Sequence, residues 1–328
     1  MKLAQKDQTA PKAAVNVQAM AAVGLAAATT LALLAVLPLV ASPYVVNLAF
    51  RVLLFATLAL GLNVFTGLTG YVNFGYSGLL GLGAYAFAIS VAKYQQPWPA
   101  GLLAAGVASA LFSLLIGLPL LRVRGVYFAI ATLGVAGALR VLTASEYLQD
   151  LTNAAGGILI LTGVSLNGQY YLMLGLCLVS LAVMLGLLSS KFGLQLLAIR
   201  EDELAAEVLG IPTGLWKLLA FVASGTIGGL AGALLAMYLT YIDPSIVYDV
   251  TYSLRPLVML LFGGFGTLLG PLLGAVFFTI VSELIWSRFL TYHLLIFGVV
   301  LVALVLLMPE GVILWLQRRG VLPRSRLL

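Results

Sequence analysis

The chain has 328 residues, of which 62% are hydrophobic and only 9% are charged; an average soluble domain has roughly 25% charged residues. A soluble fold cannot keep so much apolar surface away from water. The apolar runs are continuous rather than alternating, which excludes a transmembrane β-barrel. The composition therefore predicts an all-α fold, a polytopic transmembrane helical bundle. The net charge of +6 lacks the interleaved aromatic residues of a nucleic-acid surface, so we expect lipid and no nucleic acid around the chain.

A helix that crosses the membrane needs about 20 apolar residues. This criterion predicts about ten spans, at residues 20–41, 46–63, 74–92, 100–121, 125–143, 170–188, 216–240, 254–269, 271–287 and 291–308. Lysines and arginines gather in both tails, so the positive-inside rule predicts cytoplasmic termini. The loop with Arg122 and Arg124 then lies inside the cell, whereas residues 146–167 and 243–249 lie outside.

The predicted organisation is a single membrane domain between two tails. We expect a cytoplasmic N-terminal tail at 1–18, a transmembrane domain at 19–308 and a basic cytoplasmic C-terminal tail at 309–328. The predicted location is the bacterial inner membrane. The single cysteine, Cys177, falls within a span, which excludes a disulfide framework or a cysteine-based metal site.

Two stretches are unusually rich in glycine. Gly61–Gly83 contains seven glycines in 23 positions, and Gly263–Gly274 contains five. Glycine in membrane helices often only permits close packing, and polar side chains there often only bond across helices. Runs this dense also suggest discontinuous or re-entrant backbone that lines a cavity. The candidate translocation-pathway residues are therefore Asn63, Thr66, Thr69, Asn73, Ser77, Gly263, Gly264 and Gly266.

The one long polar loop, residues 189–216, predicts a short amphipathic helix on the cytoplasmic side. Apolar residues recur at near-helical spacing from Leu196 to Leu209, and Gly210 followed by Pro212 predicts the end of the helix. Such a helix could rest on the bilayer surface. Its polar face is more acidic than basic, however, and anionic lipid would repel it. Docking into a groove of a soluble partner fits the charge better.

Five segments of the chain carry a family resemblance. They are GLNVFTGLTGYVNFGYSGLLGLGAY (61–85), RGVYFAIATLGVAGALRVL (124–142), AIREDELAAEVLG (198–210), LFGGFGTLLGPLLGA (261–275) and MPEG (308–311). In this order they resemble segments of the branched-chain amino-acid permeases of ABC importers, the LivH/LivM family, and of its LivM-type members in particular. The segment at 198–210 looks like the family's cytoplasmic coupling loop. The resemblance covers roughly residues 45–312. Phe74–Ser77 departs from a small-polar-His run common in the family, which leaves the substrate open.

The resemblance implies a permease subunit that moves branched-chain or other small apolar amino acids. It implies as partners a homologous permease subunit, or a second copy of this one, two cytoplasmic ATPase subunits and a periplasmic substrate-binding protein. ATP would be hydrolysed by the partners, and no cofactor is expected on this chain, which lacks a phosphate-binding G-x-x-x-x-G-K-[ST] motif. The expected ATPase-coupling residues are Arg200, Glu201, Asp202, Glu203, Glu207 and Gly210.

Other functions remain open at this stage. A urea or short-amide ABC permease would share the same spans, and a stand-alone channel or secondary carrier would need no ATPase. Gly75–Gly78 also matches the GxSG of rhomboid-like intramembrane proteases, with Ser77 as nucleophile and His293 as base, although the predicted topology separates them by about 30 Å. Arg140 and Glu283 are the charges closest to span interiors, and a snorkelling or structural role is the simpler interpretation.

Overall fold

The computed structural model describes residues 29, 30, 32–288 and 298. The chain separates into two compact units, Met1–Val46 and Asn47–Leu328. In the first unit, residues 32–40 form a largely exposed helix. The predicted tails at 1–18 and 309–328 lie outside the described residues, as do residues 20–28 and 31 of the predicted span at 20–41 and, apart from residue 298, the span at 291–308.

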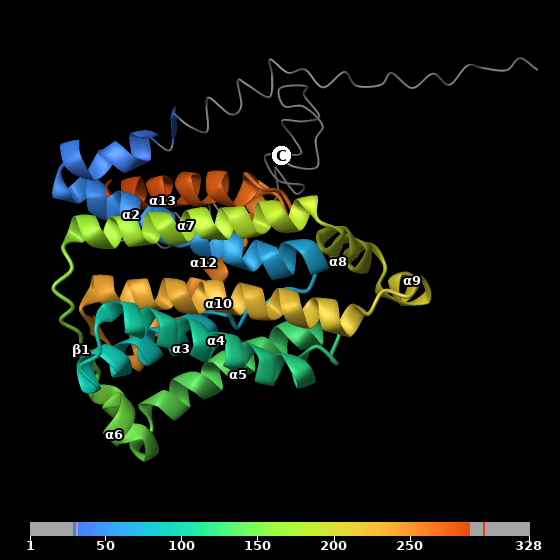
Figure 1. Cartoon of the computed structure of the whole chain (residues 1–328), viewed down its shortest axis with the longest axis horizontal. Coiled ribbons are helices and arrows are strands. Elements are labelled where there is room, and N and C mark those ends of the chain that lie inside the picture. The colour runs from blue at the N-terminus through green and yellow to red at the C-terminus, as the bar shows by residue number, and fades with distance from the viewer. Residues whose placement is uncertain (1–28, 31, 289–297, 299–328) are drawn as a thin grey trace, which may run out of the picture. The chain divides into compact units, whose positions relative to one another are not determined.

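The described part is almost entirely helical, and Figure 1 shows its arrangement. A pair of two-residue strands, β1 and β2, is the departure from the predicted all-α fold. In chain order the elements are α2 (Pro43–Leu62), η1 (Asn63–Gly67), α3 (Tyr76–Ala88), η2 (Ile89–Lys93), α4 (Trp98–Leu120), α5 (Val126–Ala144), η3 (Glu146–Leu148), α6 (Gln149–Thr152), η4 (Ala154–Gly156), β1 (Ile158–Leu159), α7 (Leu166–Ser189), α8 (Lys191–Glu201), α9 (Glu203–Val208), α10 (Thr213–Leu239), β2 (Tyr241–Ile242), α11 (Pro244–Val247), α12 (Thr251–Gly263) and α13 (Gly270–Arg288).

Six helices in the described part are long and apolar enough to cross a membrane, so the prediction of about ten spans is not confirmed. The predicted span at 74–92 is instead a 13-residue α-helix, α3, continued by the short π-helix η2. Helix α13, Gly270–Arg288, coincides with the predicted span at 271–287, and its apolar part includes Gly270–Ile285. The six candidates are Pro43–Gly67, Trp98–Leu120, Val126–Ala144, Leu166–Ser189, Thr213–Leu239 and Pro244–Gly263.

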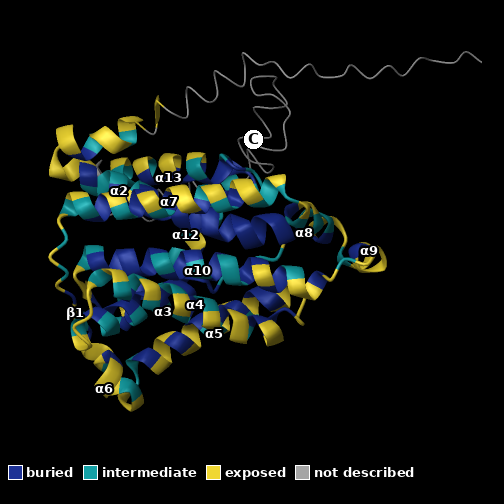
Figure 2. Ribbon diagram, in the orientation of Figure 1, coloured by how far each residue is buried: buried dark blue, intermediate teal, exposed yellow. Residues whose placement is uncertain are grey.

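Helix α10 forms the centre of the second unit. It packs against α3 and α4, and both α10 and α3 are mostly buried (Figure 2). Small residues make this close packing possible: an added Cβ on Gly83 would strike the backbone of Gly229, and one on Gly232 would strike the carbonyl of Leu80. These glycines therefore permit close packing of helices, which is the simpler of the two interpretations given for the glycine-rich stretches.

Both glycine-rich stretches also interrupt helices. Helix α2 continues through the π-helix η1 to Gly67, and residues 70–74 are not helical before α3 begins. The second interruption corrects the predicted span at 254–269, because α12 ends at Gly263 and α13 begins only at Gly270. Gly264 has a φ of 120°, which continues no helix and which residues with a Cβ rarely adopt.

The loops after α5 and after α10 meet at one end of the bundle. There β1 pairs with β2 in antiparallel register, with Ile158 opposite Ile242 and Leu159 opposite Tyr241. The 24-residue helix α7 then leads from this end to α8 and α9 at the other (Figure 1). The two loops predicted to lie outside the cell therefore lie together.

Candidate functional site

The predicted amphipathic helix is two helices, which corrects the single helix expected between Leu196 and Leu209. Helix α8 ends at Glu201, and α9 begins at Glu203. Between them Asp202 has an extended backbone, with φ −156° and ψ 107°. Its Oδ1 accepts hydrogen bonds from the backbone N–H groups of Leu204 at 2.9 Å and Ala205 at 3.0 Å. Asp202 is thus the N-cap of α9, and this cap explains why the chain turns there.

Helix α9 ends at Val208, and Gly210, the predicted stop, lies in the turn that follows it. Gly210 has a φ of +83°, a left-handed conformation that glycine adopts without strain. Its N–H donates to the Glu207 carbonyl at 2.9 Å, and the next N–H, of Ile211, donates back to Ala206 at 3.0 Å. The chain therefore turns sharply and leads directly into α10.

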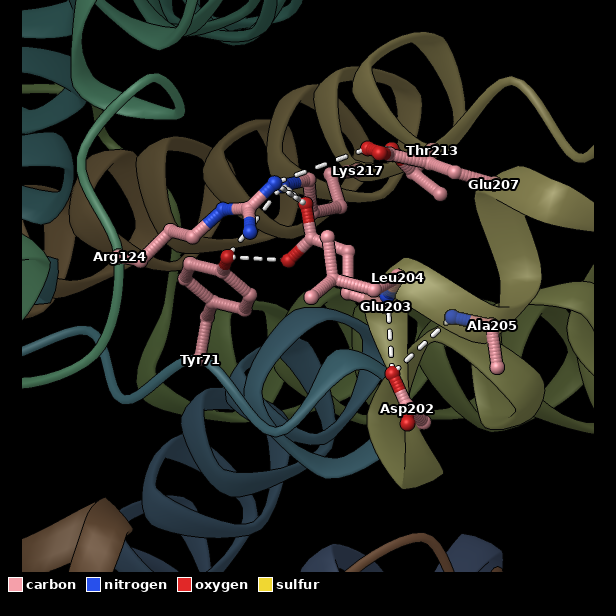
Figure 3. Close-up of polar contacts among 9 residues, drawn as sticks. All are labelled: Tyr71, Arg124, Asp202, Glu203, Leu204, Ala205, Glu207, Thr213 and Lys217. Carbon is pink, nitrogen blue, oxygen red and sulfur yellow. Dashed lines mark hydrogen bonds and ion pairs between the residues drawn. The ribbon is translucent and has the colours of Figure 1, made fainter.

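Glu203 points back into the protein rather than out toward a partner (Figure 3). Its Oε1 lies 2.6 Å from the Lys217 Nζ on α10, and its Oε2 accepts a hydrogen bond from the Tyr71 hydroxyl. The side chains of Lys217 and Glu203 are only 3% and 13% exposed. Arg124 also approaches the Glu203 Oε1, at 3.5 Å, from the loop before α5. Three separate segments of the chain are thus joined at the start of α9.

These contacts shift the pKa values of two groups in the network. Burial raises the pKa of the Tyr71 phenol, and its hydrogen bond to the Glu203 carboxylate raises it further. Burial opposes ionisation of Glu203 itself. The hydrogen bonds from Lys217 and Tyr71, with the charges of Lys217 and Arg124, outweigh it and hold the pKa of Glu203 below its usual range. The network therefore contains an ionised glutamate and a protonated tyrosine at neutral pH.

Glu207 belongs to the same network at its solvent-facing side. The Thr213 hydroxyl donates to the Glu207 Oε1 at 2.8 Å, and Arg124 lies 3.7 Å from the same oxygen. The remaining surface of α9 and its C-terminal end is exposed and apolar. Leu204, Val208 and Leu209 are 60%, 88% and 80% exposed. An exposed apolar tip rimmed by charges is typical of a protein-docking surface.

Arg200, another predicted coupling residue, contacts both glycine-rich interruptions. Its Nη1 donates to the Gly67 carbonyl at 2.9 Å and to the Phe265 carbonyl at 3.5 Å. The aliphatic part of the side chain lies against Gly70, where a Cβ would come within 3.2 Å of the Arg200 Cγ. Glu201, by contrast, is exposed. The α8–α9 segment is therefore in direct contact with the places where the helices break.

Asn63 joins the two interruptions to each other. Its Oδ1 accepts a hydrogen bond from the Gly266 N–H at 2.9 Å, and its Nδ2 donates to the Thr267 carbonyl at 2.7 Å. Gly67 lies in the same contact, because a Cβ there would meet both Asn63 and the Gly266 nitrogen. Segments some two hundred residues apart in the sequence are thus held together by one side-chain amide.

The other predicted pathway residues are buried and bond mainly to nearby backbone. The Thr69 hydroxyl donates to the Phe65 carbonyl at 2.8 Å, and the Asn73 Oδ1 accepts from the Gly75 N–H at 2.9 Å. Thr66 accepts a long bond, 3.4 Å, from the Asn73 N–H. The Ser77 N–H donates to the Ser253 hydroxyl at 2.7 Å. Gly263 and Gly264 end α12. The partner that the protease alternative requires, His293, lies outside the described residues.

A groove of about 600 Å³ lies beside this network. The groove is lined by residues 69–72 and Phe74, by the start of α5 and by the junction of α8 with α9. Its charged side chains are Arg124, Arg200, Asp202 and Glu203. In the sequence Arg124 served only as a topology signal, and neither Lys217 nor Tyr71 was singled out as a site residue. The alternation of charge along the loop could have suggested a partner for Glu203, but no pattern in the sequence distinguishes Tyr71 from other tyrosines.

The membrane-length helices and the charged segment at one end of them define a multi-pass membrane protein of the transporter class. Residues 44–305 match the family described as branched-chain amino acid transport system / permease component, and the chain belongs to this family. It is therefore a membrane permease subunit of an ABC importer, of the LivM type.

Curated relatives agree with this assignment. The high-affinity branched-chain amino acid transport system permease LivM of Salmonella typhimurium is 30% identical over 307 residues, which cover 84% of this chain and 71% of that protein. LivM of Escherichia coli is 29% identical over the same shares. The autoinducer 2 import system permease LsrC of Yersinia pseudotuberculosis is 26% identical, over 55% of this chain and 54% of its own. No solved structure matches the chain.

Proposed function

We propose that this permease carries branched-chain amino acids inward across a bacterial inner membrane, as one half of a membrane pore. The other half is a homologous permease or a second copy, ATP is hydrolysed by two separate cytoplasmic ATPase subunits, and a periplasmic protein delivers the substrate. The similarity to two LivM proteins over 84% of the chain supports this substrate class.

The observation that supports the coupling role is the position of α8 and α9. The tip of α9 presents Val208 and Leu209 to a partner, while Arg200 at the end of α8 holds the Gly67 and Phe265 carbonyls of both helix interruptions. A force applied to the tip is therefore transmitted to the broken helices through one short rigid segment. The proposed cycle is that closure of the ATPases displaces α9 and thereby shifts the two interruptions. Arg200, Glu203 and Glu207 then position this lever, and Glu201 lies on its free surface.

The same arrangement supports cytoplasmic termini. Arg124 pairs with Glu203 and Glu207, so the loop before α5 and the α8–α9 segment share one end of the bundle, as the positive-inside rule requires. The paired loops of β1 and β2 then face the periplasm. The proposal keeps the predicted cytoplasmic tails at 1–18 and 309–328 and the membrane domain at 19–308.

The experiment that tests the function is ATP-dependent uptake of radiolabelled leucine into proteoliposomes with all partner subunits. We expect uptake that excess isoleucine or valine inhibits and that excess urea does not. Inhibition by urea alone, or leucine entry without ATPase subunits, would instead support the short-amide permease or the stand-alone carrier.

The docking role of α9 has its own test. Val208→Asp places a charge on the apolar tip, and we expect the ATPase subunits to be lost on co-purification and uptake to fall at least tenfold. Leu161→Asp is the matched control, because Leu161 is also an exposed apolar residue, 79% exposed, but lies in the loop after β1. Equal effects of the two substitutions would argue against docking at α9.

A further inference from the structure

A small polar cavity lies between α2, α12 and α13. It encloses about 50 Å³, and its polar lining is Arg51, Arg255, Thr279, Ser282 and Glu283. Charged side chains in membrane-spanning helices are costly, and they often mark substrate or ion pathways. The volume is enough for a few water molecules or one ionic head group.

The charged groups of this cavity are one ion pair and one further arginine. The Arg51 Nη1 lies 3.2 Å from the Glu283 Oε2 and forms an ion pair with it. The Arg255 guanidinium lies 5.9 Å from the centre of the Phe55 ring, in a cation–π contact that holds it over the cavity. Asp249, at the start of α12, interacts electrostatically with Arg255 from outside the lining. The cavity thus offers two cations and one carboxylate.

Thr279 supplies a second observation at this cavity. Its side chain lines the cavity, the residue is only 7% exposed, and its Oγ1 has no hydrogen-bond partner among the described residues. A buried hydroxyl without a partner costs free energy, and native proteins rarely retain one unless water or a ligand satisfies it. A structural Arg–Glu pair alone would not need such a hydroxyl beside it.

We propose that this cavity receives the zwitterionic head group of the transported amino acid during its passage. Arg255 and Thr279 bind the carboxylate of the substrate. Glu283, which its ion pair with Arg51 holds in place, binds the ammonium group. This inference depends on the proposed function and adds to it the site of recognition within the membrane. The cavity has a volume of only about 50 Å³, so the proposal places the side chain of the amino acid outside it, against apolar surface. The site would then recognise α-amino acids as a class, without distinguishing their side chains.

Two conservative substitutions test the site. Thr279→Val removes the hydroxyl without changing the shape, and Arg255→Lys keeps the charge but loses the two-pronged geometry that suits a carboxylate. The controls are Thr226→Val on α10 and Arg140→Lys on α5, which make the same chemical changes outside the cavity. Each complex is measured for its maximal ATP-dependent leucine uptake with saturating binding protein, for leucine transported per ATP hydrolysed, and for its midpoint of thermal unfolding.

We expect Thr279→Val to reduce the maximal uptake rate about fivefold, and Arg255→Lys about tenfold, with fewer leucines moved per ATP in both. The thermal midpoint of Thr279→Val should equal or exceed that of the wild type, because an unsatisfied polar group is removed. The controls should transport leucine within twofold of the wild type. A lower midpoint for Thr279→Val would show that its hydroxyl is structural and would overturn the proposal. Unchanged uptake and an unchanged number of leucines moved per ATP in both variants would also overturn the proposed site. The proposed function would still stand in that case. A wild-type complex that moves no leucine would instead refute the proposed function itself, and this site with it.

Discussion

At the scale of single residues, the structure assigns different tasks to neighbouring acidic side chains of one short segment. Glu201 is exposed, Asp202 caps α9, and Glu203 turns inward to a lysine whose side chain is only 3% exposed. A buried ion pair adds little stability compared with a well-packed apolar pair, but leaving one of its charges alone is costly. The Glu203–Lys217 contact is therefore best seen as a requirement for the correct placement of α9.

The first prediction concerns this pair. Glu203→Gln leaves the Lys217 ammonium buried without a carboxylate, and we expect it to lower the free energy of unfolding by about 3 kcal/mol. Glu201→Gln is the matched control and should change it by less than about 0.5 kcal/mol, because Glu201 is exposed. Denaturant or thermal unfolding of the purified protein measures both. Equal losses in the two variants would show that the buried pair has no special role.

The second prediction concerns pH. The folded-state pKa of Glu203 lies below the ordinary value of 4.5. A depressed carboxyl pKa means that the folded state binds its proton less readily than the unfolded state. The contribution of Glu203 to stability is therefore complete above that ordinary value and is lost as the pH falls through the lowered pKa. We expect the thermal midpoint of the wild type to drop more steeply below about pH 4.5 than that of Glu203→Gln, measured by calorimetry between pH 7 and 3. Parallel curves would contradict this.

The sequence singled out Glu203 but not the residues that bind it. Acidic residues in a loop with amphipathic periodicity are visible in the sequence, so the coupling candidates could be named. Tyr71 and Lys217 come from segments 132 and 14 residues away from Glu203, and only the folded chain brings them together. Sequence periodicity also favoured one helix over two, because the apolar spacing continues across Asp202 and conceals its capping role.

At the scale of elements, the two glycine-rich interruptions form one unit with the end of α8. The interruptions themselves were predictable, because dense glycine weakens helices and permits conformations with positive φ. That they touch each other, and that Arg200 binds both, was not predictable, since no local pattern records contacts across two hundred residues. The backbone groups freed by a broken helix must be satisfied within the protein. Asn63 and Arg200 satisfy some of them here.

The third prediction tests this unit. Asn63→Leu is similar in size but leaves the Gly266 N–H and the Thr267 carbonyl without their partner, and we expect a loss of about 2 to 4 kcal/mol in unfolding free energy. Uptake should also fall, because the two interruptions would no longer move together. Thr226→Val is the control, since Thr226 bonds only to the Val222 carbonyl of its own helix, at 2.8 Å. Hydrogen exchange should show faster opening at residues 264–269 in Asn63→Leu, and unaltered exchange there would count against the bridge.

At the scale of the whole molecule, the pairing of β1 with β2 and the ion pairs of Arg124 define two opposite ends of the second unit. Composition alone was enough to predict a helical membrane protein. The number of spans could not be predicted from composition. A hydropathy scan does not distinguish a helix that is buried within the protein, such as α3, from a helix that contacts lipid. Helix α3 is mostly buried among α10, α4 and α5.

The fourth prediction concerns orientation. In a Cys177→Ser background, Tyr147→Cys should react with a membrane-impermeant maleimide added to intact spheroplasts, since Tyr147 is 97% exposed in the loop after α5. Val208→Cys, at a site 88% exposed on α9, should react only after the membrane is permeabilised. The reverse labelling pattern would invert the proposed topology.

The Asn63 bridge also has a consequence for the order in which the protein is made. Asn63 leaves the ribosome about two hundred residues before Gly266 and Thr267, the partners of its amide. At about 5–20 residues per second, this delay is roughly 10–40 s. During that time the first interruption is already in or near the bilayer while its polar groups lack their final partners. The early half of the membrane domain must therefore wait, incompletely folded, for the late half, and a nascent chain truncated before residue 263 should depend more on the membrane's insertion and quality-control machinery than the full chain does.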